Sequence, residues 1–60
     1  MDNPFTTGDA VAVRYRGYPT LTFKYVYIII NTQDDWCWVR DNDGDAYRVR
    51  YPLFKRAGEY

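Results

Sequence analysis

Two runs of alternating side chains meet at a tight turn in residues 36–50, which read WCWVR-DNDGD-AYRVR. The first run alternates tryptophans with small apolar residues, and the second alternates arginines with apolar ones. A period of two is typical of a β-strand that buries one face. Because Asp-Gly between two such runs is a strong hairpin signal, we predict strands at 36–40 and 46–51 joined by a turn at 41–45.

Residues that favour strands also fill the rest of the chain, cut at short intervals by glycine, proline and aspartate. We expect a first strand at 10–15, a second at 21–30 and a brief last strand around residues 55–56. A polar loop is expected at 31–35, and a short helical turn at 52–54. About five short antiparallel strands in sequence predict an all-β domain that closes into a small barrel.

The length and composition set limits on how this domain is stabilised. Residues 1–60 form one domain, and so short a chain has a thin margin of stability. Cys37 is the only cysteine and there is no histidine, so we expect neither a disulfide nor a metal site. The seven Tyr, three Phe and two Trp exceed what one small barrel can bury, so some of them should lie at the surface.

The registers of the two hairpins decide which side chains are buried. If the first loop holds four residues, 32–35, Ile30 lies opposite Cys37. If the second hairpin is centred in its Asp-rich turn, Val39 lies opposite Tyr47. A slip of one residue in either hairpin would exchange the two faces of a strand.

These two registers predict one aliphatic face and one aromatic face. The predicted core consists of Val11, Val13, Val26, Ile28, Ile30, Cys37, Val39 and Val49. The predicted exposed face consists of Tyr25, Tyr27, Ile29, Trp36, Trp38, Arg48 and Arg50. In the alternative, Trp38 and some of the tyrosines fill the core.

Catalytic chemistry finds little support in the sequence. The chain has neither serine nor histidine, so no histidine activates the thiol of Cys37. This cysteine lies mid-strand between two tryptophans, and we expect an inert core residue. Asp34 and Asp35 are expected to be solvated loop carboxylates. We therefore predict a protein that is not an enzyme and has no cofactor.

Three aspartates of the second turn have the spacing of a calcium loop that begins at Asp41. The sixth position of such a loop should be glycine and is Ala46, and the twelfth should be glutamate and is Pro52. We therefore assign Gly44 and its neighbours to the turn rather than to a metal site.

The net charge is zero, but the charges are distributed unevenly. Residues 31–45 carry −4, residues 46–60 carry +3 and residues 1–30 carry +1. Such an uneven charge distribution affects which partners the protein attracts and does not determine its fold. There is no secretory signal, the longest apolar run (25–30) is too short to span a membrane, and a single thiol fits a reducing compartment. The expected location is cytoplasmic, with no membrane partner.

Arginines interleaved with aromatic residues are the most informative feature for function. Trp, Tyr and Arg are the residues that dominate protein–protein hot spots. We predict a protein-binding surface made of Tyr25, Tyr27, Trp36, Trp38, Arg48 and Arg50. The same surface would also suit self-association. The alternative is nucleic-acid binding through Arg14, Arg16, Arg48 and Arg50, since aromatic rings beside guanidinium groups suit single strands. In a third interpretation there is no ligand, and the cation–π pairs simply cover the surface of the barrel.

The pattern resembles the SH3-like small barrels, a group that includes Tudor-type modules. Residues 8–13 resemble the entry to the first strand of these domains, 37–49 their third and fourth strands, and 52–54 their short helical turn. The resemblance implies binding of peptides, modified side chains, nucleic acids or other subunits. Asp34-Asp35-Trp36 is similar to the acidic pair and tryptophan of peptide-binding members, although the loop at 16–20 is short and basic where those members have a long acidic one.

The chain begins with methionine and has no linker, which predicts a complete small protein. Complete proteins of this size often come from bacteria or phages and act by docking on a larger host protein. The expected function is therefore that of a small regulatory protein.

Overall fold

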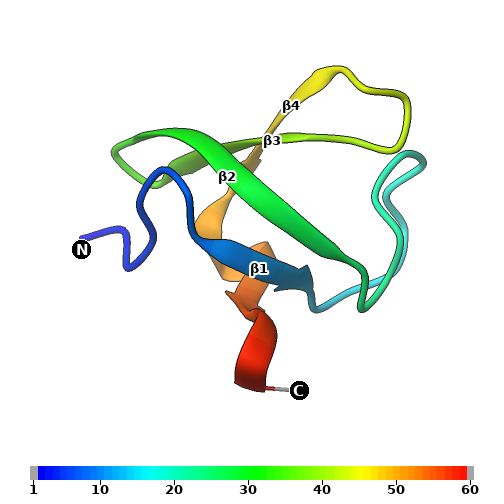
Figure 1. Ribbon diagram of the computed structural model, residues 1–60, viewed down its shortest axis with the longest axis horizontal. Coiled ribbons are helices and arrows are strands. Elements are labelled where there is room, and N and C mark those ends of the chain that lie inside the picture. Colours follow the sequence, from blue (N-terminus) through cyan, green and yellow to red (C-terminus); the bar gives the residue numbers. More distant parts are fainter. Residues whose placement is uncertain (1, 60) are drawn as a thin grey trace.

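The computed structural model describes residues 2–59, which form one five-stranded antiparallel sheet (Figure 1). Its strands are β1 (Ala10–Val13), β2 (Val26–Gln33), β3 (Trp36–Arg40), β4 (Ala46–Arg50) and β5 (Phe54–Arg56). Two short 3-10 helices, η1 (Tyr51–Leu53) and η2 (Ala57–Glu59), follow β4 and β5. The all-β prediction is confirmed, including the helical turn near the C-terminus. No helix within residues 2–59 has the length and apolarity needed to cross a membrane.

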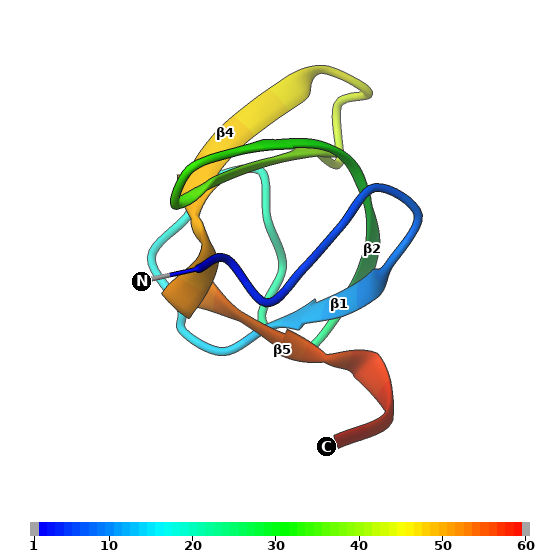
Figure 2. The same ribbon diagram turned by 90° about the vertical axis from the view of Figure 1, so that its left-hand side faces the viewer.

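The sheet is strongly curved, and its strands follow the order β4-β3-β2-β1-β5. The long strand β2 pairs with β1 through residues 26–28 and with β3 through residues 29–33. It thereby joins two halves of the sheet that lie on opposite sides of the interior in Figure 2. The edge strands β4 and β5 are connected by η1 and not by a hydrogen-bonded ladder. The sheet therefore stays open, and the predicted closure into a barrel is wrong.

The second hairpin has the predicted register. Val39 lies opposite Tyr47, and the whole β3–β4 ladder runs without interruption. Its turn is stabilised by Asp41, whose Oδ1 accepts hydrogen bonds from the backbone N–H groups of Asp43 and Asp45, at 3.0 and 2.9 Å. Gly44 has a φ of 84°, a conformation that glycine adopts without strain. The carboxylate of Asp41 thus serves the turn.

The first hairpin differs from the prediction. Its turn consists of two residues, 34–35, and not of the predicted four, because Gln33 already pairs with Trp36. Asp34 has a φ of 52°, which aspartate tolerates better than most residues. The strand expected at 21–30 is therefore displaced toward the C-terminus and ends at Gln33.

A bulge at Ile30 changes the buried face of β2. Asn31 pairs with Trp38 but Ile29 pairs with Val39, so one extra residue lies between the two pairs on β2. The extra residue shifts the alternation by one, which turns Ile29 and Tyr27 inward. The prediction that Val26, Ile28 and Ile30 are buried is wrong, since these side chains are 57%, 51% and 37% exposed.

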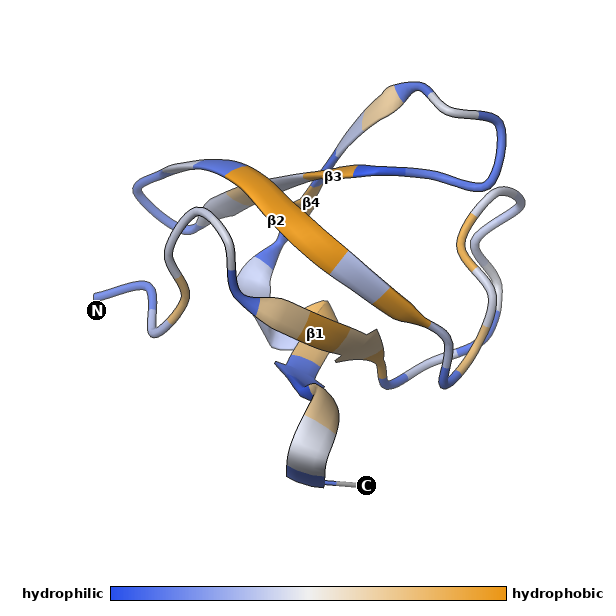
Figure 3. Ribbon diagram, viewed as in Figure 1, coloured by the Kyte–Doolittle hydropathy of each residue, from blue (hydrophilic) through white to orange (hydrophobic). Residues whose placement is uncertain are grey.

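The core lies inside the curve of the sheet and draws on every strand. It comprises Phe5, Val11, Val13, Leu21, Tyr27, Ile29, Cys37, Val39, Val49, Leu53 and Phe54. The predicted core members of β1, β3 and β4 are therefore confirmed. Figure 3 shows why β2 was ambiguous, because it is apolar along most of its length and gives no alternation to read.

The long connection from β1 to β2, residues 14–25, folds back over the end of the core. Leu21 is 3% exposed and anchors this loop. The amide of Asn42 ties it to the β3–β4 turn, because its Oδ1 accepts from the Tyr27 hydroxyl at 2.7 Å and its Nδ2 donates to Thr22 Oγ1 at 2.9 Å. The first strand ends at Val13, two residues earlier than predicted.

Candidate protein-binding groove

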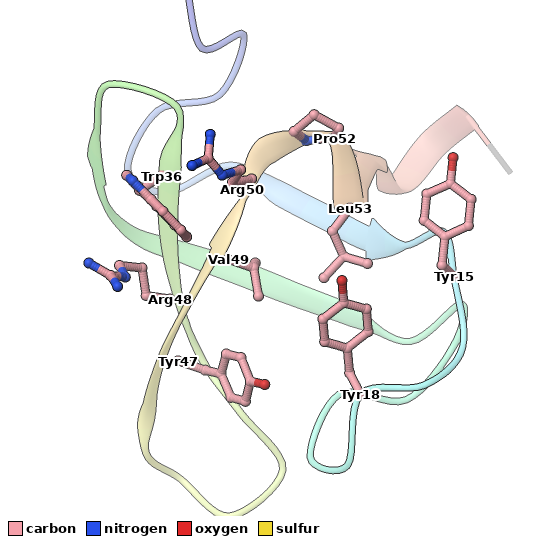
Figure 4. Close-up of a pocket in the computed structure, with 9 residues that line it drawn as sticks. All are labelled: Tyr15, Tyr18, Trp36, Tyr47, Arg48, Val49, Arg50, Pro52 and Leu53. Carbon is pink, nitrogen blue, oxygen red and sulfur yellow. The ribbon is translucent and has the colours of Figure 1, made fainter.

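A hollow of about 520 Å³ lies along β4 and faces the β1–β2 loop (Figure 4). Its lining comes from four elements and comprises Tyr15, Tyr18, Trp36, Tyr47, Arg48, Val49, Arg50, Pro52 and Leu53. We call this hollow the β4 groove. Residues 47–50 are consecutive, and consecutive side chains of a strand point to opposite faces. A hollow that all four line must therefore run along the free edge of β4.

Two arginines hold the indole of Trp36 at one side of the β4 groove. The guanidinium carbons of Arg48 and Arg50 lie 4.3 and 4.6 Å from the centre of the ring system. The β3–β4 register produces this arrangement, because Arg50 is directly opposite Trp36 and Arg48 is its diagonal neighbour on the same face. Each exposed cation–π contact contributes about 0.5–1 kcal/mol, which helps to fix the indole.

The other side of the β4 groove is formed by the loop and by η1. Figure 4 shows Tyr18 and Leu53 across the hollow from Trp36, with Tyr15 farther along the same side. The start of the loop is joined to η1, since the backbone N–H of Arg14 donates to the carbonyl of Leu53 at 2.8 Å. Tyr15 is 54% and Tyr18 36% exposed, so both rings offer apolar surface to a ligand.

The arginines of the β4 groove are not neutralised by neighbouring carboxylates. Within residues 2–59, no aspartate or glutamate comes within ion-pair distance of Arg48 or Arg50, whereas Arg56 has Asp9 as a partner at 3.5 Å. Stacking on an indole uses the face of a guanidinium and leaves its N–H edge available for hydrogen bonds. The turn at 34–35 is joined to the start of η1, because the carbonyl of Asp35 accepts from the N–H of Tyr51.

The structure brings together only part of the predicted protein-binding surface. Trp36, Arg48 and Arg50 meet in the β4 groove. Trp38 is half-buried on β3 and lies outside the lining, and Tyr25 is 63% exposed, also outside it.

Tyr27 was wrongly placed on the exposed face. Its ring is 8% exposed because the bulge at Ile30 turns it inward. Its hydroxyl accepts a hydrogen bond from the N–H of Thr22 at 2.8 Å and donates to Asn42. Tyr27 therefore belongs to the core and to the loop anchor.

The four arginines of the nucleic-acid alternative do not form one cluster. Arg14 lies near Pro52, whose carbonyl accepts from Nη1 at 3.5 Å, and it stacks on Tyr15 with 5.3 Å between guanidinium carbon and ring centre. Arg16 stacks on Phe23 at 4.7 Å and does not line the groove.

The predicted binding surface lacked six residues that line the β4 groove, namely Tyr15, Tyr18, Tyr47, Val49, Pro52 and Leu53. Tyr15 and Tyr18 lie in the loop, and Pro52 lies in η1. The signal available for the tyrosines was their place beside Gly17 and Pro19, since large aromatic residues in a turn-forming segment have no strand face to occupy. Their convergence on β4 depends on the loop folding back, which is a long-range contact.

The surroundings of Cys37 and the placement of the acidic side chains bear on thiol and metal chemistry. Burial raises the pKa of the Cys37 thiol, an effect that a hydrogen bond from Asn3 Nδ2 at 3.3 Å opposes. A thiol with a raised pKa is a poor nucleophile at neutral pH. In the described part of the chain, no three side chains of His, Cys, Asp or Glu cluster so as to hold a metal ion.

Comparison with known proteins adds no family to this description. No protein-family model matches the chain, and the searches of curated proteins and of solved structures returned no match either.

Proposed function

We propose that this chain is a small, non-enzymatic SH3-like module that docks on a larger protein partner through the β4 groove. Five antiparallel strands, the Asp-rich hairpin and a helical turn before the last strand support the SH3-like resemblance. The observation that carries the docking proposal is the convergence of Trp36, Tyr15 and Tyr18 on one hollow with two arginines that have no carboxylate partner within residues 2–59. The few residues that dominate the binding energy of protein interfaces are enriched in Trp, Tyr and Arg.

The shape of the β4 groove favours an extended segment of the partner. The hollow follows a strand edge and is open, with aromatic rings on both sides. An extended peptide presents alternate side chains to such a surface. We therefore expect the partner to insert a short exposed stretch of chain. We keep the expectation of a cytoplasmic setting, which rests on the single thiol.

Selection from a library of random peptides tests this proposal. Peptides that bind the chain are measured again with Trp36→Ala, with Tyr18→Ala and with the control Tyr25→Ala, which removes an exposed ring outside the groove. We expect Trp36→Ala and Tyr18→Ala each to weaken binding by about 1–2 kcal/mol and Tyr25→Ala to have little effect.

Two results would contradict the proposal. One is a failure to select any peptide, and the other is an equal loss with Tyr25→Ala. Circular dichroism of each variant separates lost binding from lost folding. If Trp36→Ala unfolds the chain, Tyr18→Ala still decides the outcome, because Tyr18 lies in the loop and outside the core.

Nucleic acid is the second candidate ligand, and the stacking of Arg48 and Arg50 on Trp36 favours it. Single strands bind to aromatic rings beside guanidinium groups. The aspartates at 41–45 and at 34–35 oppose phosphate binding over part of the surface. Titration with random-sequence oligonucleotides tests this alternative, since phosphate contacts predict affinity that falls steeply with added salt. Absence of binding at low salt would eliminate it.

A further inference from the structure

The free edge of β4 determines how a partner chain is held. Hydrogen-bonded pairs alternate along an antiparallel ladder. The N–H of Asp41 donates to the carbonyl of Asp45 at 2.8 Å, and the N–H of Tyr51 donates to the carbonyl of Asp35 at 2.9 Å. Both pairs belong to the β3–β4 register.

Because every second pair between these two is hydrogen-bonded, the side to which each backbone group of β4 points can be assigned. Tyr47 and Val49 exchange hydrogen bonds with β3. Arg48 and Arg50 belong to the pairs that are not hydrogen-bonded, so their backbone N–H and C=O groups point away from β3. On that side β4 is the last strand of the sheet within residues 2–59. The backbone groups of Arg48 therefore face the β4 groove.

We infer that the partner segment adds to the sheet as a strand on the free edge of β4 and carries acidic residues at every second position. The inference rests on the proposed function and specifies its ligand. In strand addition, main-chain hydrogen bonds supply affinity and alternate side-chain positions supply specificity.

Charge complementarity fixes the acidic positions of the partner strand. Residues directly opposite Arg48 and Arg50 project on the same face as these arginines. Both arginines are exposed and stack on Trp36, and no carboxylate of residues 2–59 pairs with either of them. Glutamate or aspartate at these partner positions accepts hydrogen bonds from the free edges of the guanidinium groups.

The intervening positions of the partner strand are apolar. They lie opposite Tyr47 and Val49, whose side chains point to the inner face. There the hollow is bounded by Tyr18 and Leu53 (Figure 4). Aliphatic side chains that enter this space remove apolar surface from water, which favours binding. The segment therefore alternates acidic with aliphatic residues.

A short, end-capped peptide in which glutamate alternates with valine is the probe. Two controls accompany it, one with lysine in place of glutamate and one of the same composition in which the glutamates and the valines are grouped. We expect the alternating acidic peptide to bind at least about tenfold more tightly than either control, given the energies of cross-strand pairs. Arg48→Gln with Arg50→Gln should remove this preference, and Arg16→Gln, which lies outside the groove, should retain it.

Methylation of the peptide backbone nitrogens tests the strand pairing itself. Methyl groups on one alternate set of nitrogens should abolish binding, and those on the other set should be tolerated, because only every second N–H faces β4. Equal effects of the two sets, or equal binding of the lysine peptide, would overturn the inference. If library-selected peptides still bound the β4 groove, the proposed function would stand and only this mode of binding would fall.

Discussion

Asn42 connects the β3–β4 turn to the β1–β2 loop and to the start of β2. Its amide accepts from the Tyr27 hydroxyl and donates to Thr22, and its backbone N–H donates to the carbonyl of Thr20 at 2.9 Å. One side chain in a turn thereby holds the loop that carries Tyr18 into the β4 groove. The position of a groove residue thus depends on hydrogen bonds made elsewhere.

We predict that Asn42→Ala lowers the free energy of unfolding by about 1–2 kcal/mol, because it removes two hydrogen bonds and leaves a partly buried hydroxyl without its acceptor. Chemical denaturation provides the measurement. The matched control is Asp43→Ala in the same turn, which should change stability by less than about 0.5 kcal/mol. Equal losses in the two variants would show that the amide is not the connection.

We expect the carboxyl of Asp41 to make the stability of the fold depend on pH. The hydroxyl of Thr20 donates to its Oδ2 at 2.7 Å, and this bond, with backbone N–H groups of the turn, lowers the pKa of the carboxyl below its ordinary value. A lowered pKa in the folded state means that the stabilisation is present above the unfolded pKa and is lost as the pH falls through the folded one. We predict that stability declines below about pH 4 and that Asp41→Asn flattens this decline. Thermal unfolding across this pH range is the measurement, and an unchanged slope in Asp41→Asn would contradict the assignment.

The bulge in β2 is the element on which the two faces of the sheet depend. Ile28 and Ile29 are adjacent and chemically identical, but the first is 51% exposed and the second fully buried. We predict that Ile29→Val costs about 1 kcal/mol of stability, since it deletes a buried methyl group. Ile28→Val, the matched control, should cost less than about 0.5 kcal/mol. The reverse order, found by urea denaturation, would mean that β2 has the register without the bulge.

The two hairpins show what made one element predictable and the other not. The register of β3 and β4 followed from the Asp-Gly turn and from arginines that alternate with apolar residues. The run at 25–30 is apolar at every position, so its pattern favours neither face. No glycine marks the bulge at Ile30 in the sequence. The bulge determines which face of β2 packs in the core between β1 and β3.

The candidate site was predictable to the same extent. Trp36, Arg48 and Arg50 lie on the strands whose register was right, and they meet as expected. Tyr15 and Tyr18 were missed because their place in the β4 groove depends on the folded-back loop. Tyr27 was misplaced by the same one-residue shift that misplaced the isoleucines. Contacts within a hairpin were therefore readable, and contacts between distant segments were not.

The molecule as a whole leaves its sheet open where a barrel would close. One open edge is β4, and the loop from β1, tied to η1 by Arg14, stands across from it. The space between them is the β4 groove. Aromatic rings line it, and within residues 2–59 its two arginines have no carboxylate partner and β4 has no further strand beside it. The departure from a closed barrel is thus the feature that leaves room for the hollow, and in the proposed function it provides the binding surface.

The backbone amide spectrum of the labelled chain, recorded while a library-selected peptide is added, tests this account most directly. We predict that the largest shifts fall on the amides of Tyr18 and Arg48 and on the indole N–H of Trp36. Shifts confined to the exposed row Val26, Ile28 and Ile30 on the outer face of β2, with the β4 groove unchanged, would contradict it.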